Sequence, residues 1–89
     1  VSVMVPVFNE VEAIGPLYES ARKVLSGLGR PWELIFINDG STDGSDRKLD
    51  EIAAADPDVR VLHFRRNFGQ TAAMMAGFDH ARGEVIIPL

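Results

Sequence analysis

Short apolar runs alternate along the chain with stretches in which apolar residues recur every three or four positions. Such runs are typical of buried strands, whereas a period of three to four is typical of a helix with one apolar face. The runs predict strands over residues 2–8, 32–38, 59–64 and 85–89. The periodic stretches between them predict three helices, each joined to its neighbouring strands by a short loop.

The start of the first helix can be placed in two ways. Asn9 and Glu12 have the spacing of a capping box. Alternatively, Pro16 is the first helical residue, a position that suits its fixed φ and missing N–H. The second arrangement is favoured, with a loop to about residue 14, a helix over residues 16–28 and Gly29 at its end. The predicted apolar face of this helix comprises Ile14, Leu17, Tyr18, Ala21, Val24, Leu25 and Leu28.

The two later helices have clearer ends. Asp43 can accept a hydrogen bond at the start of the second helix, and Pro57 stops it because the residue before a proline disfavours helical geometry. The third helix is predicted over residues 70–82, with Gly83 in the position that glycine commonly takes after a helix. Its inward-facing residues are predicted to be Ala72, Met75, Ala76 and Phe78.

This alternation of strands and helices predicts the fold class. A βαβαβαβ order with short connections indicates an α/β fold in three layers, with a mainly parallel sheet between helices on both faces. Residues 1–89 contain no linker and no internal repeat, which indicates a single unit. Because the chain is short for a domain and ends in an apolar run, we expect it to be the N-terminal part of a larger domain.

Composition and charge narrow the function classes. The net charge of −4 argues against a general nucleic-acid-binding protein, which needs a basic surface. The absence of cysteine excludes a disulfide framework and a cysteine metal site. No apolar run approaches the roughly 20 residues of a membrane-spanning helix.

Candidate binding chemistry lies where the predicted strands end. Ligands of an open parallel sheet bind beyond the carboxyl ends of its strands, and these ends carry segments 6–10, 38–41 and 65–70. The segments combine an aromatic ring with carboxylates and amides, which suits a nucleoside. The glycine-rich phosphate motifs of dinucleotide-binding folds and P-loops are absent. A pyrophosphate is therefore expected to be held by a divalent metal ion.

Three motifs at these strand ends resemble those of glycosyltransferase family 2. They are Val5-Pro6-Val7-Phe8-Asn9-Glu10, Asn38-Asp39-Gly40-Ser41-Thr42-Asp43 and Arg66-Asn67-Phe68-Gly69. Each motif is weak alone, but the three follow successive strands and together span nearly the whole chain. The stretch from Arg65 to Phe78 is most similar to the polyprenyl-phosphate subgroup, which includes dolichol-phosphate mannose synthases and bactoprenol glucosyltransferases.

The resemblance implies a fold and a reaction. It implies the Rossmann-like nucleotide-binding half of a GT-A domain, in an inverting hexosyltransferase that uses a nucleotide diphosphate sugar, a polyprenyl phosphate acceptor and Mg²⁺ or Mn²⁺. It also implies a parent enzyme at the cytoplasmic face of the membrane, and it is compatible with a homo-oligomer. The family's metal-binding Asp-x-Asp follows the fourth strand, so neither catalytic residues nor metal ligands are expected before Leu89.

The family's nucleotide-sugar-binding positions correspond to these residues: Pro6, Phe8, Glu10, Asp39, Asn67, Gly69 and Gln70. The first three line the base and ribose pocket in the family, and the fourth hydrogen-bonds the base. The last three belong to a loop that closes over the nucleotide, where glycine lets the backbone approach a ligand. Asn38 stands where many members have Asp, and Phe8, where many have Tyr, keeps the stacking face without the hydroxyl group.

Two other functions are compatible with parts of this pattern. A family member that acts on a polysaccharide or on another lipid would need a base carboxylate beyond Leu89. A non-catalytic receiver-like or nucleotide-sensing module of flavodoxin-like topology would need a phosphorylatable Asp after its third strand. This chain has Arg65-Arg66 at that position, which argues against the second alternative.

Overall fold

A computed structural model describes residues 1–83 and the backbone of residues 86–88. Its elements are β1 (Ser2–Val7), α1 (Val11–Ser26), β2 (Glu33–Asn38), α2 (Ser45–Ala55), β3 (Val59–His63), α3 (Gln70–His80) and β4 (Ile86–Pro88). The predicted α/β class and βαβαβαβ order are therefore confirmed. Residues 85 and 89 of the predicted last strand lie outside the described residues.

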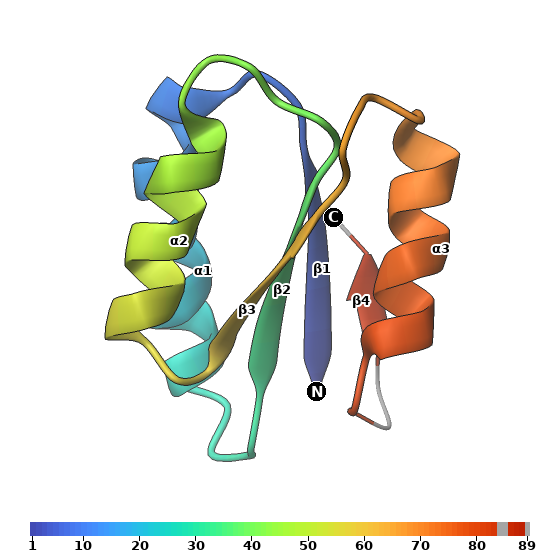
Figure 1. Cartoon of the computed structure of the whole chain (residues 1–89). Helices are drawn as coiled ribbons and strands as arrows, with labels where there is room; N and C mark the ends of the chain where they lie inside the picture. Colours follow the sequence, from blue (N-terminus) through green and yellow to red (C-terminus); the bar gives the residue numbers. More distant parts are fainter. Residues whose placement is uncertain (84–85, 89) are drawn as a thin grey trace.

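All strand pairs in the sheet are parallel, and the strand order is β3-β2-β1-β4. Helices α1 and α2 cover one face of the sheet and α3 covers the other (Figure 1). A flavodoxin-like sheet would pair its third strand with its first, whereas β3 pairs here with β2. The flavodoxin-like alternative is therefore wrong. The chain builds the sheet outward from β1 to β2 and β3, and then returns through α3 on the other face to place β4 beside β1. The direction of strand order therefore reverses between β1 and β4, and ligands of such sheets commonly bind at the carboxyl ends near this reversal.

Strand residues alternate between two apolar cores because successive side chains point to opposite faces of a sheet. The core under α1 and α2 contains the strand residues Val3, Val5, Val7, Leu34, Phe36 and Val59. The core under α3 contains the strand residues Met4, Ile35 and Ile37. Full burial of each large apolar side chain contributes roughly 1.5–3 kcal/mol. These two cores fix the register of the central strands, and with it the position of their carboxyl ends.

Helix α3 packs on the sheet through small residues. Ala73 and Gly77 are buried, and a Cβ atom at residue 77 would lie 2.5 Å from Met4 Sδ. Met75 and Phe78, predicted to face inward, are instead 62% and 49% exposed. That prediction was wrong because a close helix–sheet contact selects the face with the least side-chain volume. The helix ends at His80, before the predicted residue 82.

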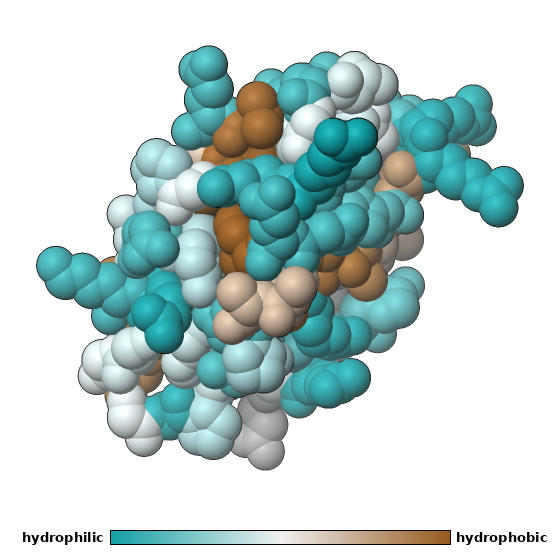
Figure 2. Space-filling view, turned by 60° about the vertical axis from the view of Figure 1, so that its left-hand side comes forward, coloured by the Kyte–Doolittle hydropathy of each residue, from teal (hydrophilic) through white to brown (hydrophobic). Residues whose placement is uncertain are grey.

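Helix α1 begins at Val11, so the favoured prediction of a start at Pro16 was wrong. Pro16 lies inside the helix, where its missing N–H removes one backbone hydrogen bond. Val24 and Leu28 of the predicted apolar face are 68% and 44% exposed. Figure 2 shows the side of the molecule that carries α1 and α2, which is mostly hydrophilic with hydrophobic patches among the charged side chains.

The carboxylate of Asp43 caps the first residues of both α1 and α2. Its Oδ2 accepts the N–H of Val11 at 3.1 Å, and its Oδ1 accepts the N–H of Ser45 at 3.0 Å. A hydrogen bond from the Ser45 hydroxyl is the largest cause that lowers the pKa of Asp43 below its ordinary value. The N-cap residue of α2 is Gly44, so Asp43 acts on this helix from the position before the predicted one, and the same carboxylate also binds the first N–H of α1.

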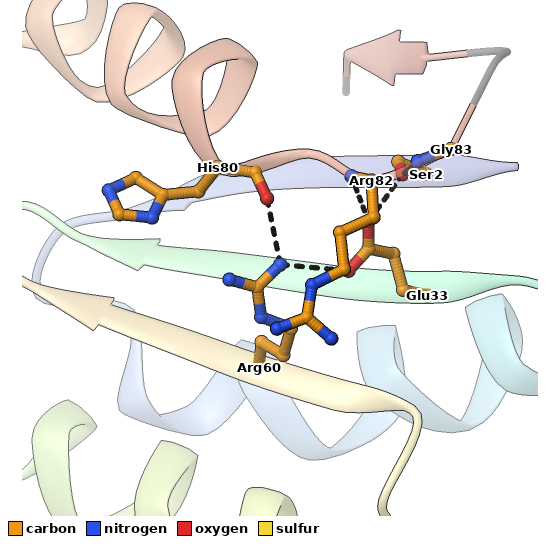
Figure 3. A network of polar contacts seen from close by, with 6 residues as sticks. All are labelled: Ser2, Glu33, Arg60, His80, Arg82 and Gly83. Carbon is orange, nitrogen blue, oxygen red and sulfur yellow. Dashed lines mark hydrogen bonds and ion pairs between the residues drawn. The ribbon is translucent and has the colours of Figure 1, made fainter.

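The partly buried carboxylate of Glu33 joins the amino ends of the strands to the segment after α3 (Figure 3). Glu33 accepts hydrogen bonds from Ser2 Oγ at 2.6 Å, from the Arg82 N–H at 2.6 Å and from Arg60 at 3.0 Å. Arg60 also donates to the carbonyl of His80 at 2.8 Å. The network therefore fixes the end of α3 against β1, β2 and β3.

The stability of the protein is expected to fall in acid because of Glu33. Burial raises the pKa of this carboxyl, but the hydrogen bonds from Ser2, Arg82 and Arg60 outweigh burial and hold the pKa at about 2, below its ordinary 4.5. A lowered folded-state pKa stabilises the fold above about pH 4.5, by up to about 3 kcal/mol, and this contribution is lost as the pH falls towards 2.

The measurement is urea unfolding of the wild type and of Glu33→Gln between pH 7 and pH 2. The wild type should be the more stable protein at pH 7, and the difference should shrink below pH 4.5. Glu51→Gln, on the exposed side of α2, is the matched control and should differ little from the wild type at any pH. A difference between wild type and Glu33→Gln that does not change with pH would contradict the assignment.

Candidate functional site

A hollow of about 300 Å³ opens at the carboxyl ends of β1 and β2, beside the start of α3. It is lined by Pro6, Val7, Phe8, Glu10, Asp39, Asn67, Gly69 and Gln70. The structure thus brings all seven predicted nucleotide-sugar-binding residues together, although their individual roles stay predictions. Sequence reasoning missed Val7 because its place in the apolar alternation of β1 indicates only a core residue.

Asp39 holds the loop that forms one wall of this hollow. Asp39 is only 4% exposed, and its Oδ1 accepts the N–H of Phe68 at 2.8 Å. Its Oδ2 accepts the N–H of Gly69 and the Nδ2–H of Asn67, both at 3.0 Å. One carboxylate at the end of β2 therefore fixes the loop that precedes α3. This loop-holding contact was not foreseen from the sequence.

Gly40 lets two loops cross at the edge of the hollow. Its φ of +73° lies in the left-handed region that favours glycine. A Cβ atom at residue 40 would overlap the carbonyl carbon of Arg66 and the backbone nitrogen of Asn67. The loop after β2 therefore passes directly under the backbone of the loop after β3, which is possible only without a side chain.

Gly69 precedes α3 and has φ +99° and ψ 162°. A Cβ atom there would meet no heavy atom within 4 Å, so in this structure glycine is required by the backbone conformation and not by crowding. Gly69→Val is therefore expected to lose stability and nucleotide affinity together. The backbone strain alone is about 1–3 kcal/mol.

Melting temperature and nucleotide affinity should be measured on the same preparation of Gly69→Val. Val24→Ala serves as the control, because Val24 is 68% exposed on α1 and is not one of the residues that line the hollow. A Gly69→Val protein with wild-type stability and wild-type affinity would show that this backbone conformation is not needed.

One aromatic ring, that of Phe8, lines the hollow, and a second, that of Phe68, belongs to the loop after β3. Phe8 is 44% exposed, so its ring face is available to a ligand. Phe68 contacts Phe64 edge-on, with ring centroids 5.7 Å apart, and the guanidinium of Arg66 lies 4.7 Å from the Phe68 centroid. These contacts hold the outer side of the loop after β3, while Asp39 holds its inner side.

The described residues do not form a metal site. No cluster of three His, Cys, Asp or Glu side chains suited to a metal ion occurs within residues 1–83. Asp39 already accepts hydrogen bonds from the protein on both oxygens, and Glu10 is exposed at the rim. The described part of the chain also has no helix with the length and apolarity needed to cross a membrane.

The sequence model described as Glycosyl transferase family 2 matches residues 2–89. The chain belongs to glycosyltransferase family 2. Its relatives include a prophage bactoprenol glucosyl transferase homolog of Escherichia coli (strain K12), which is 45% identical over 89 residues. The match covers 100% of this chain and 29% of the relative, so the chain spans under a third of that relative's length.

Two further proteins, one relative and one solved structure, are also similar to this chain. An undecaprenyl-phosphate 4-deoxy-4-formamido-L-arabinose transferase of Pectobacterium carotovorum subsp. carotovorum (strain PC1) is 44% identical over 91 residues, covering 100% of this chain and 28% of the relative. The solved mannosyltransferase PcManGT from Pyrobaculum calidifontis, in complex with GDP-Man and Mn²⁺, superimposes with a TM-score of 0.77. The two sequences are 24% identical, and the match covers 96% of this chain and 25% of the mannosyltransferase chain. The predicted GT-A fold is thereby confirmed.

Proposed function

We propose that this chain is the N-terminal, nucleotide-sugar-binding part of a longer glycosyltransferase that transfers a hexosyl group to a polyprenyl phosphate. The observation that carries the proposal is the hollow at the carboxyl ends of β1 and β2, which gathers all seven residues predicted to bind the nucleotide sugar. Two relatives support the acceptor, because their names refer to bactoprenol and to undecaprenyl phosphate.

The hollow has the groups that a nucleoside diphosphate needs. The exposed ring of Phe8 offers a flat apolar surface to the base, and the carboxylate of Glu10 is available to the ribose hydroxyls. Asp39 Oδ1 accepts one N–H from the protein, and a carboxylate oxygen has two acceptor sites. Asp39 can therefore hold the loop after β3 and still accept a hydrogen bond from a base N–H.

The proposed reaction is a direct displacement with inversion. An oxygen of the acceptor phosphate forms a bond to the anomeric carbon, while the bond from that carbon to the donor diphosphate breaks and the diphosphate leaves with the electron pair. The acceptor oxygen is already anionic and needs little help from a base. A divalent cation would neutralise charge on the diphosphate; its ligands are proposed to lie beyond Leu89, since the described residues form no metal site.

Transfer assays on the full-length enzyme test the proposal. Labelled UDP-glucose and GDP-mannose would be offered with undecaprenyl phosphate in detergent, and one donor should give a labelled lipid extractable into organic solvent. Undecaprenol without phosphate is the control and should give none. Transfer to a polysaccharide or to a lipid without phosphate, and not to undecaprenyl phosphate, would favour the alternative family 2 activity. The reaction is proposed to take place at the cytoplasmic face of the membrane.

A further inference from the structure

A second, smaller hollow lies near the carboxyl ends of β2 and β3. Its volume is about 200 Å³, and it is lined by Asn38, Ser41, Asp46, Asp50, His63 and Phe64. His63 stands between two polar partners in it. Its Nε2 lies 2.7 Å from Asp50 Oδ1, and its Nδ1 lies 3.0 Å from Asn38 Nδ2. The proposed transfer reaction uses none of these contacts.

The hydrogen-bond directions in this cluster follow from one backbone donor. The N–H of Ser41 can only donate, and it points at Asn38 Oδ1 at 3.0 Å. The amide NH₂ of Asn38 therefore faces His63, and an NH₂ group can only donate. His63 Nδ1 must accept this bond without a proton, which places the ring proton on Nε2, facing the carboxylate of Asp50.

The same cluster continues to the rim of the donor hollow. Ser41 Oγ accepts the N–H of Asn9 at 3.0 Å, and Asn9 Oδ1 accepts the N–H of Thr42 at 2.8 Å. Asn9 has a φ of +51°, in the left-handed region that asparagine adopts more readily than most residues with a side chain, and its two hydrogen bonds to Ser41 and Thr42 hold it there. Phe8 and Glu10 are the two neighbours of Asn9 in the chain, so this turn sets their positions.

We propose that His63 is a positioning residue for the nucleotide pocket. It fixes the amide of Asn38, which holds the turn at Ser41, which in turn holds Asn9 in its left-handed conformation. His63 does not itself line the donor hollow, so its effect reaches the nucleotide through the placement of Phe8 and Glu10. This role rests on the proposed function of the donor hollow.

Two substitutions at residue 63 separate this role from a general structural one. An asparagine side chain can place its carbonyl oxygen near the position of Nδ1, so His63→Asn keeps an acceptor for Asn38. A glutamine side chain reaches the position of Nε2, so His63→Gln keeps a partner for Asp50 and leaves the amide of Asn38 without an acceptor. Calorimetric titration of the full-length enzyme with UDP and GDP gives the affinities, and transfer rates give KM and kcat.

His63→Gln is expected to weaken binding of the preferred nucleotide about five- to tenfold and to raise the KM for the donor by the same factor. Its kcat should change little, because the pocket is displaced and no reacting atom is touched. His63→Asn should stay within about twofold of the wild type in both quantities. Melting temperatures of both variants show whether the fold is retained.

Two results would overturn the positioning role. Either the two variants lose affinity equally, or both bind as tightly as the wild type. A wild-type enzyme that binds neither nucleotide would instead overturn the proposed function itself. Nitrogen-15 NMR of wild-type His63 at pH 8 adds a test that needs no variant: Nδ1 should be unprotonated and Nε2 protonated, and a proton on Nδ1 would contradict the inferred network.

Discussion

Gly40→Ala is expected to lower the free energy of unfolding by about 3 kcal/mol or more and to abolish measurable nucleotide binding. The left-handed φ of +73° disfavours any side chain. A methyl group would in addition overlap the backbone of Arg66 and Asn67, which cannot move aside as a flexible side chain can. The loop after β3 must therefore leave its place at the wall of the donor hollow.

Gly29→Ala is the matched control for this result. Gly29 has a similar φ of +67°, but a Cβ atom there would meet nothing within 4 Å. This variant should show only the strain of a left-handed residue, about 1–2 kcal/mol, with unchanged nucleotide affinity. Urea unfolding and calorimetry on both variants make the comparison. Equal losses of stability would show that the crossing of the two loops contributes nothing beyond backbone strain.

Asp39→Asn is expected to weaken nucleotide binding roughly 30- to 100-fold, although it changes the shape of the side chain very little. The carboxylate accepts hydrogen bonds from Asn67, Phe68 and Gly69. An asparagine has one oxygen and one NH₂ group, so in either orientation its NH₂ faces at least one of these donors. The loop after β3 then loses its anchor, and the wall that it forms around the nucleotide is displaced.

Calorimetric titration of the full-length enzyme with UDP and GDP measures this loss. Asp39→Ala is expected to fall in a similar range, because it removes the acceptor for the base as well as the anchor of the loop. Asp79→Asn, an exposed position on α3, is the control and should bind as the wild type does. If Asp39 served only to bind the base, asparagine would retain an acceptor oxygen, and an affinity near that of the wild type would contradict the anchoring role.

Much of the candidate donor site could be predicted from local sequence. The residues that line the hollow lie at the end of β1, just after β1 and β2, and between β3 and the first turn of α3, and the carboxyl ends of parallel strands meet at one edge of a sheet. Their convergence could therefore be predicted without coordinates. The hydrogen bonds that Asp39 accepts from Phe68 and Gly69 could not be predicted in this way, because they depend on how closely the loop after β3 approaches the end of β2.

The sequence by itself determined the order of the elements, the parallel sheet and which residues gather in the candidate donor site, because apolar periodicity and strand-end motifs are local signals. The tertiary structure alone decided which face of α3 is buried, where α1 begins and which side chains hydrogen-bond to His63. Ala73 and Gly77 face the sheet because close packing favours small side chains, and Val11 starts α1 because the carboxylate of Asp43 caps it. Each of these outcomes depends on contacts between segments that are distant in the sequence, and the periodicity of apolar residues within one segment contains no information about such contacts.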